Sequence, residues 1–273
     1  MPHDRTEVSA AGAADVEVTA APPNSVGDDR DMCCERALLL YESGDVTLQA
    51  KAERWWRRAA TSGNPEAQYS LGVVLHEDAT DQSVGEAEYW WRTAASAGHV
   101  EARYNLGVLL QMRGDPEAEH WLRLGAGDGH AAAQYNLGVL LDLYGTESAR
   151  SEAQHWWRVA AEAGHTGAQY NLGVECQDRG AKRAAERWWR SAAESGHVDA
   201  QYHLGVCHHL RGEHDIAEQW WCIAALAGHL DAQHNVGTYR YRRGNLTAAE
   251  YWWRAAAEAG HPEATNTLGW LMR

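Results

Sequence analysis

Phenylalanine is absent from this 273-residue sequence, and lysine occurs only twice, at Lys51 and Lys182. Arginine and alanine are abundant instead, a composition that favours a GC-rich, bacterial genome. The cysteines are odd in number and show no CxxC spacing: Cys33, Cys34, Cys176, Cys207 and Cys222. This pattern argues against a regular disulfide framework and is typical of free thiols in a reducing cytoplasm.

Long apolar runs are also missing. No stretch approaches the roughly 18 consecutive apolar residues of a membrane span, and the N-terminal residues are acidic rather than apolar. We therefore expect neither a membrane helix nor a secretory signal. The net charge of −14, from 38 acidic and 24 basic residues, disfavours nucleic acid as a partner.

Motifs of catalysis or cofactor binding do not occur. The sequence contains no HExxH, no GxSxG, no phosphate loop and no glycine-rich dinucleotide fingerprint. We therefore expect a protein that is not an enzyme and that needs no cofactor.

The aromatic content lies largely in 14 tryptophans, most of them in pairs. A block recurs seven times and consists of a Trp pair, an Ala pair, Gly-His and the run Ala-x-Tyr-Asn-Leu-Gly-Val, as in residues 86–116. The first Trp of each block precedes the glycine of the Leu-Gly pair by 17 residues, and successive blocks are 31 to 35 residues apart. A core of constant length joined by connections of variable length is typical of stacked two-helix repeats.

Each block predicts two helices. Apolar residues recur at intervals of three and four in residues 86–112, Gly98 and Gly114 end the two helices, and no useful length alternates with period two. Capping boxes predict further helix starts at Ser151 and Thr247. Glycine inside a helix costs about 1 kcal/mol relative to alanine, so we expect the Leu-Gly glycines to make room for the Trp pair. The predicted fold class is an all-α solenoid.

Three segments are predicted along the chain. Residues 1–31 hold seven acidic residues against two arginines and little to bury, which predicts a disordered acidic tail. Residues 32–62 form an atypical N-terminal capping repeat, and residues 63–273 form the regular array, which ends in a single helix.

The motifs Ala-x-x-Trp-Trp-Arg-x-Ala-Ala-x-x-Gly-His and Ala-Gln-Tyr-Asn-Leu-Gly-Val resemble the Sel1-like repeat, a branch of the tetratricopeptide repeat superfamily. The resemblance covers about residues 50–273, with local departures such as Leu122 for a second Trp and Cys222 for an Arg. It implies an α-solenoid superhelix whose first helices line a concave groove. It also implies an adaptor or scaffold that binds a protein or peptide partner and has no chemistry of its own.

The residue before each Leu-Gly pair is the strongest candidate for a binding site. It lies off the Leu-Val stripe, and an amide there could pair with a peptide backbone of any sequence. Alternatively, the amide caps or bridges neighbouring helices. The preceding tyrosine packs either beside a ligand or only within the stack. The candidate binding residues are Asn105, Asn136, Asn171, His203 and Asn235, with Tyr104, Tyr135, Tyr170 and Tyr202.

A basic and aromatic cluster at residues 239–243 adds Arg242 as a candidate clamp for a carboxylate or phosphate. The alternative is that these cations only stabilise a helix C-terminus. The histidines that follow the helix-ending glycines are regularly spaced, and we assign them a structural role at the turn: His99, His130, His165, His197, His229 and His261.

A second function hypothesis comes from the later units, where aliphatic positions become polar. A Cys/His patch around Cys176–His214, with His203, Cys207 and His209, suggests a metal- or redox-responsive regulator. The sequence also stops one helix into its last unit, and the uncovered apolar face of that helix predicts either a homodimer contact or a contact with another partner.

Overall fold

The computed structural model describes residues 36–41 and 46–271, and every regular element within them is an α-helix. The predicted all-α fold is confirmed, while the predicted disordered tail, residues 1–31, lies outside the described residues. None of the helices in the described part of the chain combines the length and apolarity needed to cross a bilayer. Residues 36–41 are followed by α2 (Val46–Thr61), α3 (Pro65–Glu77), α4 (Asp81–Ser96), α5 (Val100–Met112), α6 (Glu117–Gly127), α7 (Ala131–Leu143), α8 (Glu147–Glu162), α9 (Thr166–Asp178), α10 (Lys182–Glu194), α11 (Val198–Leu210), α12 (His214–Leu226), α13 (Leu230–Arg242), α14 (Leu246–Glu258) and α15 (Pro262–Leu271).

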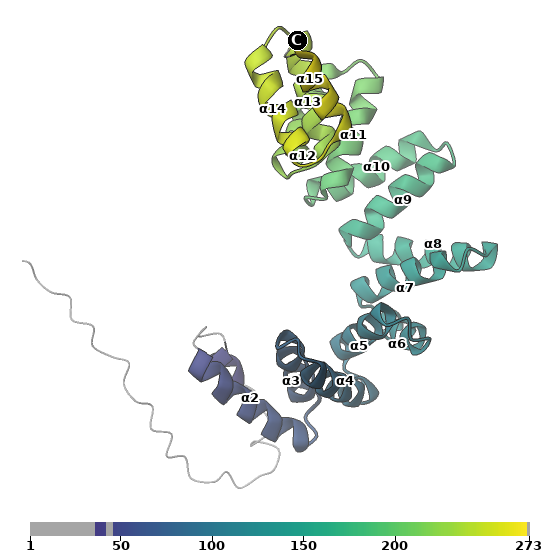
Figure 1. The fold of residues 1–273 in the computed structure, drawn as a ribbon. Coiled ribbons are helices and arrows are strands. Elements are labelled where there is room, and N and C mark those ends of the chain that lie inside the picture. The colour runs from purple at the N-terminus through teal and green to yellow at the C-terminus, as the bar shows by residue number, and fades with distance from the viewer. Residues whose placement is uncertain (1–35, 42–45, 272–273) are drawn as a thin grey trace, which may run out of the picture.

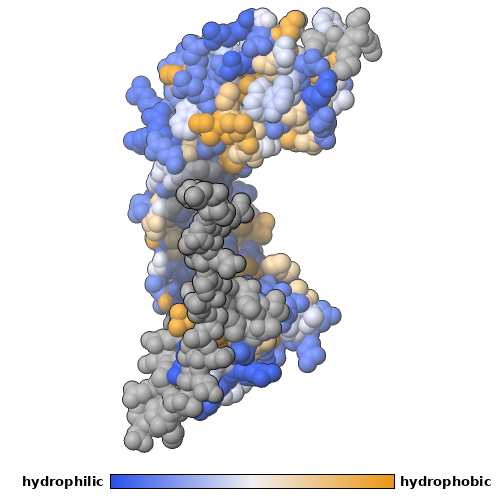
Figure 2. Space-filling view, turned by 90° about the vertical axis from the view of Figure 1, so that its left-hand side faces the viewer, coloured by the Kyte–Doolittle hydropathy of each residue, from blue (hydrophilic) through white to orange (hydrophobic). Residues whose placement is uncertain are grey.

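The helices stack in chain order into a curved solenoid. Each helix packs against the helices before and after it, and the stack follows an arc from α2 to α15 (Figure 1). In the pairs α3/α4, α5/α6 and α7/α8, the odd-numbered helix lies toward the inside of the arc. The space-filling view shows the molecule hollowed between its two ends, with hydrophobic residues gathered near the hollow (Figure 2).

Close approach of helices explains the glycine of each Leu-Gly pair. A methyl group added at Gly173 would lie 2.3 Å from Nε1 of Trp189, which belongs to the following helix and is only 3% exposed. The position opposite Gly107 is held by Leu122 instead, and an added methyl would lie 2.8 Å from its Cγ. The expected contact is confirmed and belongs to the second Trp of the next pair, as in Gly72–Trp91, Gly138–Trp157, Gly173–Trp189, Gly205–Trp221 and Gly237–Trp253.

Glycine and histidine together make the turns that follow the Trp helices from α4 on. Gly98 and Gly114 have φ angles of +94° and +70°, as a left-handed helix end requires. After a Trp helix, as at Gly98, the next residue is a histidine that caps the following helix, because its Nδ1 accepts a hydrogen bond from the backbone N–H three residues later. In the case of His165, the donor is Ala168 at 3.2 Å. The structural role predicted for these histidines is confirmed at His99, His130, His165, His197, His229 and His261.

Two predicted helix starts are wrong. Thr146 caps α8 and Asn245 caps α14, so Ser151 lies inside α8 and Thr247 lies inside α14. A Ser or Thr followed three residues later by Glu or Gln also occurs within amphipathic helices, so the pattern alone does not fix a helix end. Both helices begin nearer the N-terminus than the capping boxes predicted.

Among the described residues, ion pairs join successive Trp-bearing helices only in the first half of the array. The arginine after the Trp pair reaches a glutamate on the next Trp helix. At the equivalent positions of α10, α12 and α14 the chain has Ala184, Ile216 and Ala248, so the series ends at α8. Such exposed pairs contribute at most about 1 kcal/mol each. The three pairs are Arg57–Glu86, Arg92–Glu117 and Arg123–Glu152.

Candidate binding groove

Four pockets follow one design along the array. Each lies between two successive odd-numbered helices and includes the second Trp of the helix between them: Trp91, Trp189, Trp221 or Trp253. Their volumes are about 280 Å³ between α3 and α5, 680 Å³ between α9 and α11, 250 Å³ between α11 and α13, and 580 Å³ between α13 and α15. Together they form a row of pockets, which we call the groove.

The residue before Leu-Gly lines each of these pockets. Asn105 shares the pocket between α3 and α5 with Val108, Leu109 and Met112 from its own helix. Residues at i, i+3, i+4 and i+7 lie on one face of a helix, so the groove face of α5 follows directly from its register. The equivalent residues in the other three pockets are His203, Asn235 and Thr267. Asn136 and Asn171 occupy the same register in α7 and α9 and are half-buried.

The amide also contacts the neighbouring repeat. The Asn105 amide lies beside the Tyr69 hydroxyl of the previous repeat, and the Asn235 amide lies beside the hydroxyl of Tyr202. Burial raises the pKa of both of these tyrosines, and the neighbouring amide opposes that shift. An asparagine offers an acceptor and two donors, so this one contact leaves further hydrogen-bonding capacity facing the pocket. Asn105 and Asn235 thus contact the tyrosine of the previous repeat, and both the bridging and the ligand-binding role of the asparagine row stay predictions.

The tyrosines before these residues stack on the capping histidine of the next turn. The rings of Tyr104 and His130 are 4.6 Å apart between centroids and 26° from parallel, and Tyr170 stacks on His197 at 4.5 Å. Tyr104 and Tyr170 also line pockets of the groove. The full set of stacked pairs is Tyr69–His99, Tyr104–His130, Tyr135–His165, Tyr170–His197 and Tyr202–His229. Sequence reasoning missed this pairing, although such a Tyr and the His of the next turn recur 26 to 30 residues apart in five successive units.

The residue before the tyrosine recurs from repeat to repeat and has a structural role. The side-chain amide of Gln134 donates to the carbonyl oxygen of Ala126 at 3.1 Å, at the end of the preceding helix. Gln169 makes the same bond to Ala161, and Arg103 replaces the glutamine with a bond from Nε to Ala95 at 3.1 Å. These residues lie two positions from the asparagines, yet they are buried or turned away from the pockets.

The Cys/His patch around Cys176–His214 does not come together as a metal site. The His203 ring stacks on Trp189 with centroids 4.6 Å apart, whereas His209 faces His214 with their Nδ1 atoms 3.1 Å apart. Cys207 is a half-buried free thiol whose pKa is raised by burial, which disfavours the reactive thiolate. The metal- or redox-responsive hypothesis is not supported.

One other group of potential ligands occurs in the described residues: His234, His261 and Glu263. Both ring nitrogens of His261 already have partners there. Its Nδ1 accepts the capping hydrogen bond from Ala264, and its Nε2 lies 3.0 Å from Asp231. The group is therefore part of the helix cap, with His234 in the place of the stacked tyrosine.

Arg242 lies at the wall between two pockets of the groove, the one between α11 and α13 and the one between α13 and α15. Its neighbours in sequence are paired: Arg240 with Glu218 at 2.5 Å and Arg243 with Asp215 at 2.9 Å. Arg242 itself is exposed and forms no ion pair within the described residues. The predicted homodimer contact on α15 also stays a prediction, with Trp270 79% exposed there.

Seven consecutive segments match the sequence profile of the Sel1 repeat: residues 32–64, 65–99, 100–130, 131–165, 166–197, 198–229 and 230–261. The chain belongs to the Sel1 repeat family. From residue 65 on, each Sel1 segment begins with a Leu-Gly helix and ends with a Trp helix. The helices that line the groove are therefore the first helices of the repeats.

Two solved structures show the same architecture. One is a protective antigen present in uropathogenic Escherichia coli strains that displays an SLR fold; it is 26% identical, with a TM-score of 0.73 over 88% of this chain and 56% of that one. The other is a Sel1 repeat protein from Oxalobacter formigenes, also 26% identical with a TM-score of 0.73, over 89% of this chain and 76% of that one. The Sel1 chain described here thus spans little more than half the length of the first. No curated protein sequence matches it.

Proposed function

We propose that this Sel1 repeat protein is a non-catalytic adaptor that binds an extended protein or peptide segment along the groove. The observation that carries the proposal is the repetition of one pocket design between successive first helices. Each pocket offers an indole, one or more aliphatic or threonine side chains and a polar side chain at the position before Leu-Gly. A row of similar pockets suits a ligand that is itself a repeating chain, such as a peptide in extended conformation.

Dimensions support a peptide ligand. Neighbouring packed helices lie about 8–10 Å apart, and an extended peptide rises about 3.3 Å per residue, so one repeat advances along the peptide by a few residues. The amides of Asn105, Asn136, Asn171 and Asn235, together with His203, would then hydrogen-bond the peptide backbone. The indoles and valines would accept its side chains.

The cytoplasm is the compartment that we propose. Cys176, Cys207 and Cys222 are all free thiols, as expected in a reducing environment. Burial raises the pKa of Cys207 and Cys222, so both thiols behave as packing groups at neutral pH.

The test compares two triple variants against a labelled 12-residue peptide selected from a random display library. Changing Asn105, Asn136 and Asn171 to alanine removes the amide before Leu-Gly from three successive repeats. Each lost hydrogen bond costs about 1 kcal/mol, so we expect affinity to fall about a hundredfold or more while the melting temperature changes little.

The matched control changes Arg103, Gln134 and Gln169 to alanine. These residues lie on the same three helices, two positions earlier, and donate to backbone carbonyls. We expect this variant to melt at a lower temperature and to keep its affinity for the peptide. Equal loss of affinity in both variants, or no loss in the asparagine variant, would contradict binding through the asparagine row.

A further inference from the structure

The pockets of the groove differ in their charged residues. The pocket between α3 and α5 contains Glu77, and the pocket between α9 and α11 contains Asp178 and Glu186 beside Lys182, Arg183 and Arg211. The walls of the two pockets at the C-terminal end, between α11 and α13 and between α13 and α15, contain no carboxylate among the described residues. Arg242 lines both of them, on a chain whose net charge is −14.

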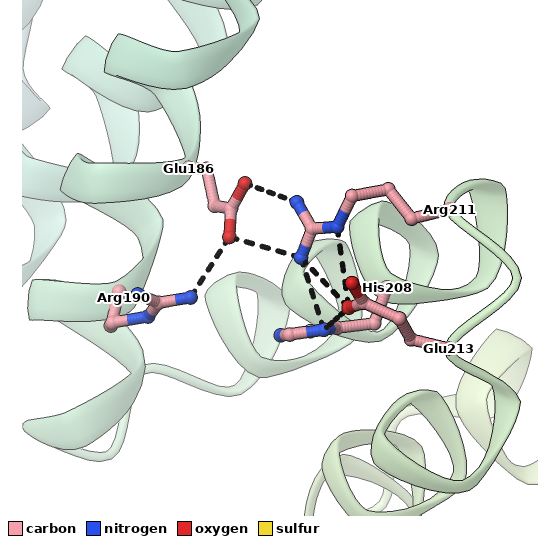
Figure 3. A network of polar contacts seen from close by, with 5 residues as sticks. All are labelled: Glu186, Arg190, His208, Arg211 and Glu213. Atoms are coloured by element: carbon pink, nitrogen blue, oxygen red, sulfur yellow. Dashed lines mark hydrogen bonds and ion pairs between the residues drawn. The ribbon is translucent and has the colours of Figure 1, made fainter.

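Two arginines beside the pocket between α9 and α11 are neutralised by neighbouring acids. Figure 3 shows the network beside the pocket between α9 and α11, in which Arg211 binds Glu186 and Glu213, and Arg190 binds Glu186. The hydrogen bond from Arg211 lowers the pKa of the Glu186 carboxyl, as expected for a satisfied ion pair. Arg190 and Arg211 are therefore not free for a ligand. Arg242, like Lys182 and Arg183, has no ion-pair partner among the described residues, and it differs from those two in lining pockets without a carboxylate.

Further polar groups lie around Arg242. His209 of α11 faces His214 of α12 across 3.1 Å, and its ring packs against Trp221. The pKa of His209 is lowered by burial and by the nearby positive charges of His214 and Arg242. No carboxylate offsets those charges at His209. His209 and Arg242 thus share the pocket between α11 and α13, and His214 contacts His209 from the neighbouring helix.

Hydrogen-bond donors complete the same pocket. The pocket between α11 and α13 has a volume of about 250 Å³ and includes the Asn235 amide and the Thr238 side chain beside Arg242 and His209. The Thr238 hydroxyl donates to the His234 carbonyl at 3.0 Å, so it is held in place and keeps its lone pairs for other donors. The Tyr239 hydroxyl, by contrast, is already bound to Asp215 at 2.8 Å. Arg242 and Asn235 are therefore the donors open to a carboxylate.

The adjacent pocket, between α13 and α15, is aromatic. Its walls include Tyr241, Trp253 and Trp270, and its volume is about 580 Å³, enough for a large apolar side chain. Arg242 separates this pocket from the carboxylate-free pocket beside it. The C-terminal end of the groove therefore places a cationic site next to an apolar one.

We propose that the C-terminal end of the groove selects acidic peptides, with Arg242 pairing an Asp or Glu side chain of the partner. Asn235 donates a second hydrogen bond to the same carboxylate, and the Tyr241–Trp253–Trp270 pocket takes a neighbouring apolar side chain. The inference rests on the proposed peptide-binding function and adds the chemistry of the partner. Charge complementarity favours it, because a peptide carboxylate supplies the counter-charge that Arg242 lacks.

Binding of two fluorescein-labelled 12-residue peptides to the full chain tests the inference. The peptides are identical except that four Glu in one are Gln in the other, with Tyr and Leu among the remaining residues. Fluorescence polarisation is expected to show about tenfold tighter binding of the Glu peptide, the difference that one charge-assisted hydrogen-bonded pair makes. Arg242→Gln should bring the two peptides to within about twofold of each other.

The control is Arg243→Gln, which removes the same charge one residue away. Arg243 is paired with Asp215 and lies outside both pockets, so its loss should leave the Glu-to-Gln preference unchanged. Arg242 is exposed and unpaired, so its variant should melt like the wild type, and a folding defect would not explain a lost preference.

Two results would overturn the inference. If Arg242→Gln and Arg243→Gln weaken the Glu peptide equally, the preference comes from overall charge. If neither peptide is preferred while the asparagine triple variant still loses affinity for its selected peptide, the groove binds peptides without selecting acids. In that second case the proposed function survives and the acidic preference fails. If no peptide of any kind binds, both proposals fail.

Discussion

The most specific structural prediction concerns Gly173. An alanine methyl at this position would lie 2.3 Å from Nε1 and 2.4 Å from Cδ1 of Trp189. The indole is 3% exposed and stacked against His203, so it can move away from the methyl group only by disturbing that stack. The helices α9 and α10 would have to separate to admit the methyl group.

The magnitude follows from two opposing effects. Overpacking a core costs about 1–3 kcal/mol, and contacts so far below the optimal carbon separation of about 3.5–4.0 Å favour the upper end. Replacing a helical glycine with alanine stabilises the helix by about 0.5–1 kcal/mol. We therefore expect Gly173→Ala to lower the stability by about 2 kcal/mol, which corresponds to about 4–8 °C in Tm for a chain of this size.

Gly269 provides the matched control. It occupies the same repeat position in α15, yet an added methyl group would meet nothing within 4 Å. Gly269→Ala should leave Tm unchanged or raise it, since only the helix propensity changes. The assay is thermal unfolding followed by circular dichroism. A Gly173→Ala protein that melts at or above the wild-type temperature would refute the packing explanation of the Leu-Gly glycines.

Two further predictions follow from the stack. Trp90→Ala should cost about 3–5 kcal/mol in stability and leave peptide affinity unchanged, because the side chain is buried in the core; unchanged melting with lost binding would move Trp90 to the ligand site. Burial lowers the pKa of His165, so the folded array favours the neutral ring, whose Nδ1 caps α9. The stability from this group is present above the unfolded pKa of about 6.5 and is lost as the pH falls through the lower folded value. His165→Asn copies the natural Asn64 cap, which does not titrate, and should make Tm less dependent on pH between about 7 and 5; an unchanged pH profile would contradict this role.

The hydrophobic periodicity and the helix-ending glycines made the fold predictable from sequence. The apolar stripes gave the helices, and Gly98 and Gly114 marked their ends, because a positive φ strains every other residue type. The capping histidines were also assignable to the turns from their regular spacing alone. A repeat unit carries these signals several times over, so accidental patterns were averaged out.

Contacts between neighbouring repeats were harder to predict. The spacing of Tyr104 and His130 shows that they recur together, but only the superhelical geometry shows that their rings stack. The same holds for the contact between Asn105 and Tyr69, because two residues far apart in sequence meet only once the packing angle of the helices is fixed.

Local patterns also misled in two places. Ser151 resembles a helix start because capping boxes and amphipathic helix interiors share residue types. The histidines and cysteines near Cys207 are close in sequence, but the helix points them to different neighbours, so His203 meets Trp189 instead of a thiol. The sequence alone did not show which pockets of the groove contain a carboxylate, because this depends on which residues share a pocket in the folded chain.

Photo-crosslinking from the two sides of the solenoid tests the central claim most directly. A benzophenone amino acid is placed at Met112, which is 80% exposed and lines the groove, or at Tyr89, which is 61% exposed on α4 outside the four pockets. Both positions are exposed, so neither substitution should disturb the fold. We expect the selected peptide to crosslink to the protein substituted at Met112 and not to the protein substituted at Tyr89. Crosslinking from Tyr89 alone would show that the ligand binds outside the groove.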